Sequence, residues 1–391
     1  MLHEETSKTQ QSCKRRGWAL RLIVPAGLAA AVLALLSVVS LANAANFVHI
    51  ATAANTRGDH TDIDNPVING RPLSTRLLVT PTLSPNGTAA VVDNHPVGVW
   101  YNGSTQKWSI FNEDKASMPV GAAFNVRIQD TAATNTPIQT AQQTNARSNS
   151  TYITNALTDG NPNAIVMITP NWNPDGVGGT YSNHNTGVWY NGKQWAIYNE
   201  DRLTMPVDAS FNTELFSAAG DGVFVHTAAS SNTPNVLPSF GQVYTIIDNP
   251  MTNGNPRAIL FVTHNWNPTG KAGLYVDSPL AVNYLPAEQK WAIVATSSSE
   301  TASPMPIGAA FNVLVTSGEV AVRYYEGESA TGSLQEALDK ALQQLGKDLP
   351  EGGIFDAMAQ WTIVAITGWQ GGIAGFNTVR VKISATRSPS W

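Results

Sequence analysis

The sequence predicts a mainly β fold, with three tandem antiparallel β-sandwich-like modules followed by a small α+β domain of β-α-β-β order. Two observations carry this prediction. One phrase, Trp-x-Ile followed by Met-Pro and then by Phe-Asn, occurs over residues 108–125, 195–212 and 291–312. After residue 316 the pattern changes, and an amphipathic helix appears. The chain is therefore an array of similar units with a different domain at its C-terminal end.

The spacing of the phrase sets the size of the unit. Met118, Met205 and Met305 lie 87 and then 100 residues apart, which is too long for a solenoid rung and typical of a small folded domain. We expect β-repeats over residues 45–126, 127–222 and 223–316, and the α+β domain over 317–391.

Within a repeat, the clearest local structure is a hairpin. In the second repeat, residues 187–190 lead into Asn191-Gly192 and return through 194–198, and Asn-Gly supplies the positive φ of a tight hairpin turn. Alternation places Trp195 and Ile197 on one face. An earlier apolar run in each repeat reads as a buried strand; these runs are residues 77–79, 165–168 and 259–262.

The joins between repeats leave little linker. Each repeat is expected to open with a strand, at residues 47–49, 129–133 and 224–229. Frequent Gly, Pro and Asn between short strands are typical of β-sandwiches. Closely joined modules of this kind predict a semi-rigid rod.

The repeats resemble an exported bacterial repeat module of unassigned function. The matching residues are the Val-Trp-Tyr-Asn-Gly, Trp-x-Ile, Asn-Glu-Asp and Met-Pro phrases. The resemblance implies no particular activity.

The N-terminus has the pattern of an export signal. Basic residues such as Arg15 and Arg16 precede an apolar run over residues 22–41, and the small-residue triplet Ala42-Asn43-Ala44 follows. This order indicates a signal peptide over residues 1–44 and a secreted or cell-surface protein. The alternative is an uncleaved anchor, since the run is just long enough to cross a hydrocarbon core of about 30 Å.

Composition limits the partners. The formal net charge is −5 and charged residues make up 13% of the chain, which argues against nucleic acid, because phosphate binding needs clustered Lys and Arg. The single cysteine, Cys13, precedes the apolar run, so the exported part has no disulfide and no cysteine-based zinc site. A polar, weakly charged surface suits cell-wall or extracellular polysaccharide.

Two tryptophans are the strongest candidate ligand-binding residues. Each lies between amides in a loop rich in Pro and Gly, a setting in which an indole can stack on a sugar while amides bind hydroxyls. The alternative is that each indole closes the end of a sandwich core. The candidate residues are Asn171, Trp172 and Asn173, with their counterparts Asn265, Trp266 and Asn267.

A repeated Asn-Glu-Asp phrase offers oxygen ligands. Calcium takes six to eight oxygens from flexible loops, so this cation is one hypothesis, and a polar loop that caps a turn is the alternative. Paired carboxylates of a glycosidase would have to face one another, which neighbouring strand residues do not. The residues are Asn112, Glu113 and Asp114, with Asn199, Glu200 and Asp201.

Paired histidines also recur. His95 matches His184, and His49 matches His226. No serine or cysteine nucleophile accompanies them in a recognisable motif, so we interpret them as hydrogen-bonded turn or core residues.

The C-terminal segment predicts a strand, a helix and two strands. The strands cover residues 320–325, 361–366 and 378–383. Ser333 to Glu336 form a capping box at the start of the helix, and Gly346 ends it. Apolar residues at 334, 337, 338, 341, 342 and 345 form one stripe. A unit this small buries little surface alone, so it predicts a homo-oligomer.

This segment resembles the dodecins, on the order of its elements, the Ser-Leu-x-x-Ala-Leu helix, Trp361 at the start of the second strand and Gly368 at its end. The resemblance implies assembly as a dodecamer and binding of flavin against Trp361. Asn377 stands about where the family has a flavin-binding glutamine, and the stretch over 349–360 is longer than in the family.

These patterns together favour a secreted or cell-surface, non-enzymatic repeat protein with a binding or structural role and a C-terminal oligomerisation module. A secreted polysaccharide hydrolase using Glu113 or Glu200 is one alternative. Sequestration of flavin by the C-terminal domain is another.

Overall fold

The computed structural model describes residues 46–220, 222–234, 243–296, 305–316, 323–347, 358–371 and 375–388. The export signal expected over residues 1–44, together with Cys13, lies outside the described residues.

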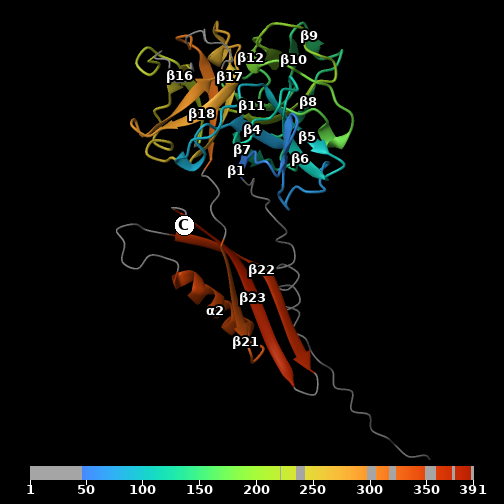
Figure 1. Cartoon of the computed structure of the whole chain (residues 1–391), viewed down its shortest axis with the longest axis vertical. Helices are drawn as coiled ribbons and strands as arrows, with labels where there is room; N and C mark the ends of the chain where they lie inside the picture. The colour runs from blue at the N-terminus through green and yellow to red at the C-terminus, as the bar shows by residue number, and fades with distance from the viewer. Residues whose placement is uncertain are drawn as a thin grey trace, which may run out of the picture. The chain divides into compact units, whose positions relative to one another are not determined.

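The first repeat is a β-sandwich of two antiparallel sheets (Figure 1). One sheet has the order β1-β7-β4, with β1 (Asn46–Ile50), β7 (Ala123–Ile128) and β4 (Leu77–Pro81). The other has the order β2-β3-β6-β5, with β2 (Thr56–Arg57), β3 (His60–Ile63), β6 (Lys107–Asn112) and β5 (Val97–Asn102). One hydrophobic cluster takes side chains from both sheets, which confirms the predicted sandwich.

The other two repeats follow the same plan. The second has β8 (Ile138–Thr140), β14 (Ser210–Phe216) and β11 (Ile165–Pro170) in one sheet, and β9 (Ala146–Arg147), β10 (Ser150–Tyr152), β13 (Trp195–Asn199) and β12 (Thr186–Tyr190) in the other. The third has β15 (Val223–Thr227), β20 (Ala310–Thr316) and β17 (Ile259–Asn265) in one layer, and β16 (Val243–Ile246), β19 (Lys290–Ala295) and β18 (Leu280–Leu285) in the other. Because β12 pairs with β17, the strands β15-β20-β17 and β12-β13-β10-β9 form one seven-stranded sheet across the two repeats. Each repeat also has one short 3-10 turn: η1 (Pro85–Gly87), η2 (Pro174–Gly176) and η3 (Pro268–Gly270).

One predicted opening strand is wrong. Residues 129–133 form a turn segment, and the strand that corresponds to β1 and β15 in the second repeat is β8. Its partner is β14, just as β1 pairs with β7 and β15 with β20.

The tryptophan of each repeated phrase is the centre of its own core. Trp108, Trp195 and Trp291 are 0%, 0% and 1% exposed and belong to different clusters. The indole N–H of Trp195 donates to Asn161 O at 2.8 Å, and that of Trp291 to Asn255 O at the same distance. These residues set the sandwich interior, as their alternation predicted.

The opposite face of the same strands is buried as well. Phe111 and Tyr198 lie on that face and are each only 3% exposed, although alternation alone would leave them on the surface. The next repeat covers them, so the outer face of this sheet is an interface between repeats.

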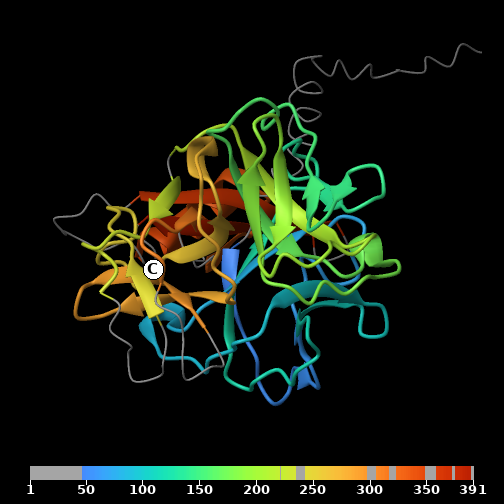
Figure 2. The same cartoon turned by 90° about the horizontal axis from the view of Figure 1, so that it is seen from above.

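The expected rod is wrong, because the third repeat returns to the first and closes a ring. Three equivalent threonines show the closure. Val79 N–H donates to Thr169 Oγ1 at 2.9 Å, and Ile168 N–H to Thr263 Oγ1 at 3.1 Å. Val262 N–H donates to Thr80 Oγ1 at 3.1 Å, which completes the circle. Viewed from above, the three repeats surround a common centre (Figure 2).

The last residue of the repeated phrase makes a second set of such bonds. Asn125, Asn212 and Asn312 each donate from Nδ2 to a backbone carbonyl of another repeat, at 2.9, 3.0 and 2.9 Å. All three are buried. The ring is therefore held by hydrogen bonds that repeat with threefold pseudosymmetry.

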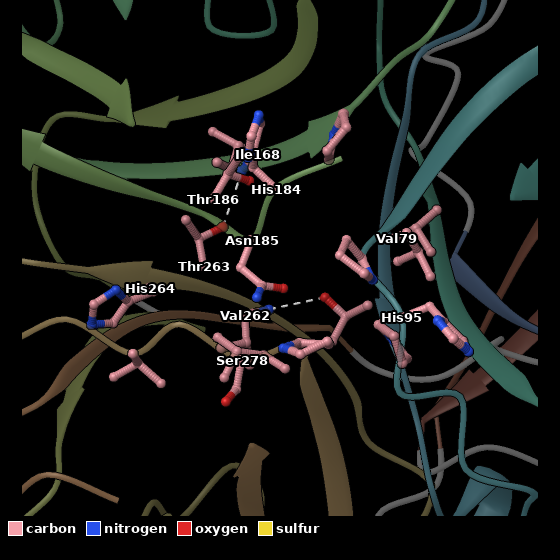
Figure 3. A pocket seen from close by; sticks show the side chains of 18 residues that line it. Val79, His95, Ile168, His184, Asn185, Thr186, Val262, Thr263, His264 and Ser278 are labelled. Carbon is pink, nitrogen blue, oxygen red and sulfur yellow. Dashed lines mark hydrogen bonds between the residues drawn. The ribbon is translucent and has the colours of Figure 1, made fainter. Parts of the chain in front are cut away.

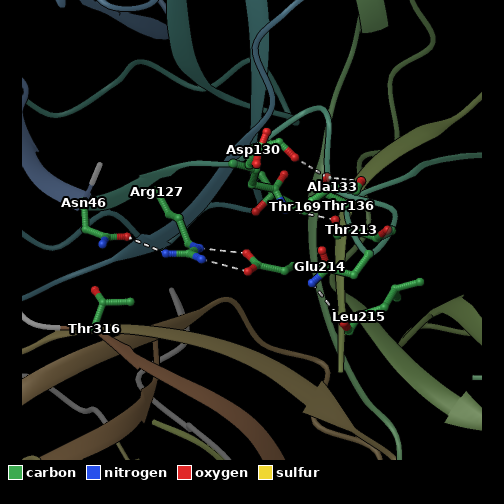
Figure 4. Close-up of polar contacts among 12 residues, drawn as sticks. Asn46, Arg127, Asp130, Ala133, Thr136, Thr169, Thr213, Glu214, Leu215 and Thr316 are labelled. Carbon is green, nitrogen blue, oxygen red and sulfur yellow. Dashed lines mark hydrogen bonds and ion pairs between the residues drawn. The ribbon is translucent and has the colours of Figure 1, made fainter. Parts of the chain in front are cut away.

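The interior of the ring contains an apolar cluster and an ion pair. Leu78, Met167 and Phe261 occupy equivalent strand positions and share one cluster. Arg127 of the first repeat binds Glu214 of the second through two N–H···O bonds of 2.7 and 2.8 Å, and also Asn46 (Figure 4). The third repeat has Leu314 at the position of Arg127 and Glu214, so at this position only the first and second repeats are joined by an ion pair.

The C-terminal domain has the predicted β-α-β-β order. Its sheet has the order β21-β23-β22, with β21 (Arg323–Ser329), β23 (Phe376–Ser388) and β22 (Met358–Gly371). The helix, α2 (Leu334–Lys347), packs on β21 and β23. Its buried residues are Ala337, Ala341 and Leu345, which confirms the core of the predicted stripe.

The helix start uses half of a capping box. Ser333 Oγ accepts from Glu336 N–H at 3.2 Å. The Glu336 carboxylate instead accepts from the hydroxyls of Ser329 and Thr331, at 2.6 and 2.9 Å, and so ties the helix to the preceding strand. Within the described ranges, no helix combines the length and apolar character that a bilayer crossing requires.

Candidate functional site

An aromatic hollow lies where the second repeat meets the third, and we call it the 2/3 pocket. Its volume is about 240 Å³. The second repeat contributes residues on β10, β12 and β13, and the third contributes two residues after β17. The lining residues are Asn149, Ser150, Trp189, Tyr198, Trp266 and Tyr275.

Backbone pairing brings these residues together. Strand β12 pairs in parallel with the end of β17, and Trp266 N–H donates to Val188 O at 2.9 Å. The amide of Asn267 accepts from Tyr190 N–H at 2.7 Å and donates to Tyr190 O at 2.8 Å. Trp266 is thereby fixed beside Trp189.

The rings form walls at large angles to one another. Trp189 and Trp266 are edge-on, with centroids 6.3 Å apart. Tyr275 lies 5.9 Å from Trp266 and 5.9 Å from Tyr198. Ring faces of this kind contact the C–H groups of a sugar well.

Polar atoms also line the hollow. Ser150 Oγ accepts from the Trp189 indole N–H at 3.2 Å and lies 3.3 Å from Asn149 Oδ1. The indole nitrogen of Trp266 is buried without a hydrogen-bond partner among the described residues. The pocket therefore combines aromatic ring faces with polar atoms.

A buried hydrogen-bond cluster lies at the wall formed by Tyr198. The Tyr198 hydroxyl donates to Glu200 Oε1 at 2.6 Å and lies 3.0 Å from His264 Nδ1. Glu200 also bonds His264 and accepts from Val276 N–H at 3.1 Å. Burial, and then the Glu200 charge, raise the pKa of Tyr198 above its ordinary value. The phenol therefore stays protonated and cross-links the two repeats.

The equivalent junction between the first and second repeats lacks this cluster. Glu113 corresponds to Glu200, but among the described residues it accepts one hydrogen bond, from the backbone N–H of Ser182 at 3.1 Å. Burial raises the pKa of Glu113 to about 7, against the smaller opposing effect of that hydrogen bond.

A second hollow of about 90 Å³ lies on the pseudothreefold axis (Figure 3). His95 and His184 stand on different sides of it, and each binds a carboxylate through Nδ1 at 2.6 Å, to Asp114 and Asp201 respectively. In the part of the chain that the structure describes, no group of three or more His, Cys, Asp or Glu is arranged to hold a metal ion.

The family described as domain of unknown function (DUF7452) matches three times, over residues 33–128, 98–215 and 204–315. The chain belongs to this family. Comparison with curated proteins and with solved structures finds no match.

The DUF7452 repeats use the predicted amides for assembly. Asn173 makes the same pair of bonds to Tyr101 as Asn267 makes to Tyr190, at 2.7 and 2.9 Å. Asn171 donates to Asn212 Oδ1 at 2.9 Å, and Asn265 donates to Asn312 Oδ1 at 2.8 Å. All four amides are buried. Asn173 and Asn267 join neighbouring repeats, whereas Asn171 and Asn265 position the asparagines that do so within their own repeats.

The two predicted tryptophans have different surroundings. Both are partly buried. Trp266 lines the 2/3 pocket. Trp172 contacts Trp100 and Tyr181, with ring centroids 6.1 and 5.7 Å apart.

The Asn-Glu-Asp phrases point to separate partners. Asn112 and Asn199 each donate from Nδ2 to a backbone carbonyl in the following turn. The glutamates, Glu113 and Glu200, enter different junctions, and the aspartates, Asp114 and Asp201, bind the axial histidines. The two glutamates therefore do not face one another as a catalytic pair.

The two flavin-related positions lie apart within the chain. Trp361 pairs with Ala385, whereas Asn377 pairs with Gln370. Eight residues of β23 separate these points, or roughly 26 Å. Asn377 Nδ2 donates to Thr331 O at 2.8 Å, so one copy does not bring the two side chains to one site.

Sequence reasoning missed Trp189 and Tyr275 as pocket residues. Trp189 lies in the recurring Val-Trp-Tyr phrase, and its recurrence at Trp100 was a usable signal. Tyr275 lies in a loop of the third repeat, and only the packing of that repeat against the second places it beside Tyr198.

Proposed function

We propose that this chain is an exported carbohydrate-binding protein that holds a sugar unit of an extracellular or cell-wall polysaccharide in the 2/3 pocket. The observation that carries the proposal is the hollow of about 240 Å³ walled by Trp189, Trp266 and Tyr275. Its size suits one pyranose ring. Aromatic faces with a few polar atoms at the edge are a common way to bind sugars.

The test is a titration of the full chain with soluble xylan, mixed-linkage β-glucan, galactomannan and polygalacturonate, followed by tryptophan fluorescence. Trp266→Ala should weaken binding about 30-fold, since loss of one central aromatic contact costs about 2 kcal/mol or more. Trp172→Ala is the matched control, because it removes the equivalent indole outside the pocket. Equal binding by wild type and Trp266→Ala would refute the proposal.

The proposal includes export through the N-terminal segment. The basic residues, the apolar run over 22–41 and the Ala42-Asn43-Ala44 triplet support it. N-terminal sequencing of protein recovered outside the cell should begin near Ala45, whereas a start at Met1 would indicate a retained anchor.

The proposal also assigns assembly of several copies to the C-terminal domain. Trp361, Ile363 and Ile366 share the helix side of the sheet by register, but α2 packs on the other two strands. Trp361 and Ile366 are therefore 39% and 53% exposed. A second copy could cover them, and linked copies would raise the effective concentration of pockets.

Light scattering on the full chain tests this assembly. Ile366→Glu should lower the solution mass, because it places a charge on the uncovered apolar face. Thr367→Glu is the control, since its side chain lies on the other face of the same strand. A wild-type chain that is already monomeric would contradict the assignment.

A further inference from the structure

Each residue that lines the 2/3 pocket has a counterpart at the junction between the first and second repeats. The strand registers establish this, since Ser150 pairs with Tyr198 and His60 pairs with Phe111. Asp59 corresponds to Asn149, His60 to Ser150, Trp100 to Trp189, Phe111 to Tyr198, Trp172 to Trp266 and Tyr181 to Tyr275.

The aromatic walls of the two junctions have nearly the same geometry. The Trp100–Trp172 centroids are 6.1 Å apart at 90°, compared with 6.3 Å and 87° for the pair in the 2/3 pocket. Trp172–Tyr181 and Trp266–Tyr275 both have an interplanar angle of 51°. The rings at Phe111 and Tyr198 each meet their tyrosine at 80°, with centroids 6.0 and 5.9 Å apart.

The main difference is what stands in front of the first tryptophan. In the 2/3 pocket, the short Ser150 side chain accepts the indole N–H of Trp189 at 3.2 Å and leaves the hollow open. At the other junction, the His60 imidazole lies edge-on to Trp100, with centroids 5.3 Å apart. Asp59 holds this imidazole through Nδ1 at 3.0 Å.

We infer that the junction of the first two repeats is a second saccharide site of the same construction, which the imidazole of His60 occupies as an internal ligand. The inference rests on the proposed function of the 2/3 pocket. Residue 150, and its counterpart His60, then decide whether a junction is open. A small side chain leaves room for a sugar ring, and an imidazole takes that room.

The third junction is a natural negative control. At the junction of the third and first repeats, Asn283 corresponds to Trp189, Leu83 to Trp266, Val92 to Tyr275 and Val294 to Tyr198. Leu83 and Val294 belong to one hydrophobic cluster, with Val92 and Tyr244 packed against it. Tyr244 stands at the position of Ser150, since Tyr244 pairs with Val294 as Ser150 pairs with Tyr198. None of the four wall residues is aromatic, and a tyrosine stands at the position of Ser150, so this junction should not bind sugar.

Reciprocal exchange of the two residues tests the inference. Hexasaccharides prepared from the four glycans named above are titrated into the full chain by calorimetry. Wild type should bind one equivalent, His60→Ser two, and Ser150→His none. The double exchange should bind one equivalent, now at the other junction, and Trp172→Ala should abolish that binding.

Each outcome decides a different point. A well-folded His60→Ser chain that still binds one equivalent overturns the inference but leaves the proposed function intact. If His60→Ser does not fold, Ser150→His carries the test, and unchanged binding by that variant overturns the inference. If Trp266→Ala binds as well as wild type, the proposed function fails, and this inference fails with it.

Discussion

The two aromatic junctions have the same backbone and ring geometry but different buried chemistry. At the 2/3 junction, Glu200 bonds Tyr198, His264 and a backbone N–H. At the junction of the first and second repeats, Phe111 and Pro170 stand at the positions of Tyr198 and His264. There Glu113 accepts one hydrogen bond in the described part of the chain, from a backbone N–H. One repeat architecture therefore tolerates both a partnered and a nearly unpartnered buried carboxyl.

Ring closure and the chemistry of each junction are separable. Threonine and asparagine bonds close the ring at all three junctions. The residues around the buried carboxyl vary, and the third junction replaces that carboxyl with Thr296. The three junctions therefore differ mainly in the residues that line the pocket and in those that surround the buried carboxyl.

The largest effect is expected from His264→Leu. His264 is 1% exposed and hydrogen-bonded to the equally buried Glu200. Glu200 keeps its bonds to Tyr198 and Val276 in this variant, but removal of one partner from a buried pair typically costs about 3–5 kcal/mol. Urea unfolding should report this loss. His184→Leu, at the partly exposed axial rim, should cost far less, and equal losses would contradict the special role of the 2/3 cluster.

A smaller, pH-dependent effect is expected from Glu113→Gln. Burial raises the folded-state pKa of Glu113 to about 7, above its ordinary 4.5. Its contribution to stability is therefore fully present below pH 4.5 and is lost as the pH rises through 7. Glutamine removes this dependence, so the variant should gain about 3 kcal/mol relative to wild type between pH 4 and pH 8.

Urea unfolding at both pH values checks the gain. The shared titrations of other groups cancel in the comparison of variant with wild type. Glu200→Gln is the matched variant at the other junction and should destabilise at both pH values, because it disturbs bonds to Tyr198 and His264. A pH-independent difference for Glu113→Gln would show that the Glu113 carboxyl is better solvated than its position indicates.

Much of each repeat could be predicted from sequence because its interactions are local. The Asn191-Gly192 turn and the alternation around Trp195 lie within one hairpin, and both predictions are confirmed. Ring closure could not be predicted in this way. Asn125 bonds the carbonyl of a residue 135 positions away, and no local pattern encodes that distance.

One signal for closure was nevertheless present. The asparagine of the Phe-Asn pair occurs in all three repeats, although a buried strand has no local use for an amide. A buried polar side chain needs a hydrogen-bond partner. Its threefold recurrence therefore indicated a repeated contact between units. The pocket remained hidden for the same reason, because its walls come from two repeats.

An intermediate effect is expected from Asn173→Ala and Asn267→Ala. Each asparagine makes two bonds to the backbone of the neighbouring repeat, to Tyr101 and Tyr190 respectively. Loss of the amide leaves those buried backbone groups unsatisfied, which costs about 1–3 kcal/mol. Thermal unfolding should give similar losses for the two variants. A large difference would show that the junctions are not equivalent in their backbone contacts.

The smallest effect concerns the cations beside the outer tyrosines. Lys115 Nζ lies 4.2 Å from the Tyr181 ring centroid, whereas the Arg202 guanidinium carbon lies 5.4 Å from that of Tyr275. Both residues have nearly the same positive φ, 64° and 63°, so backbone strain cancels when each is replaced by methionine. Exposed cation–π contacts contribute about 0.5–1 kcal/mol. Lys115→Met should therefore lower the free energy of unfolding slightly more than Arg202→Met. If Arg202→Met lowers the free energy of unfolding by more than Lys115→Met does, Arg202 stabilises its junction through further interactions besides its contact with the Tyr275 ring.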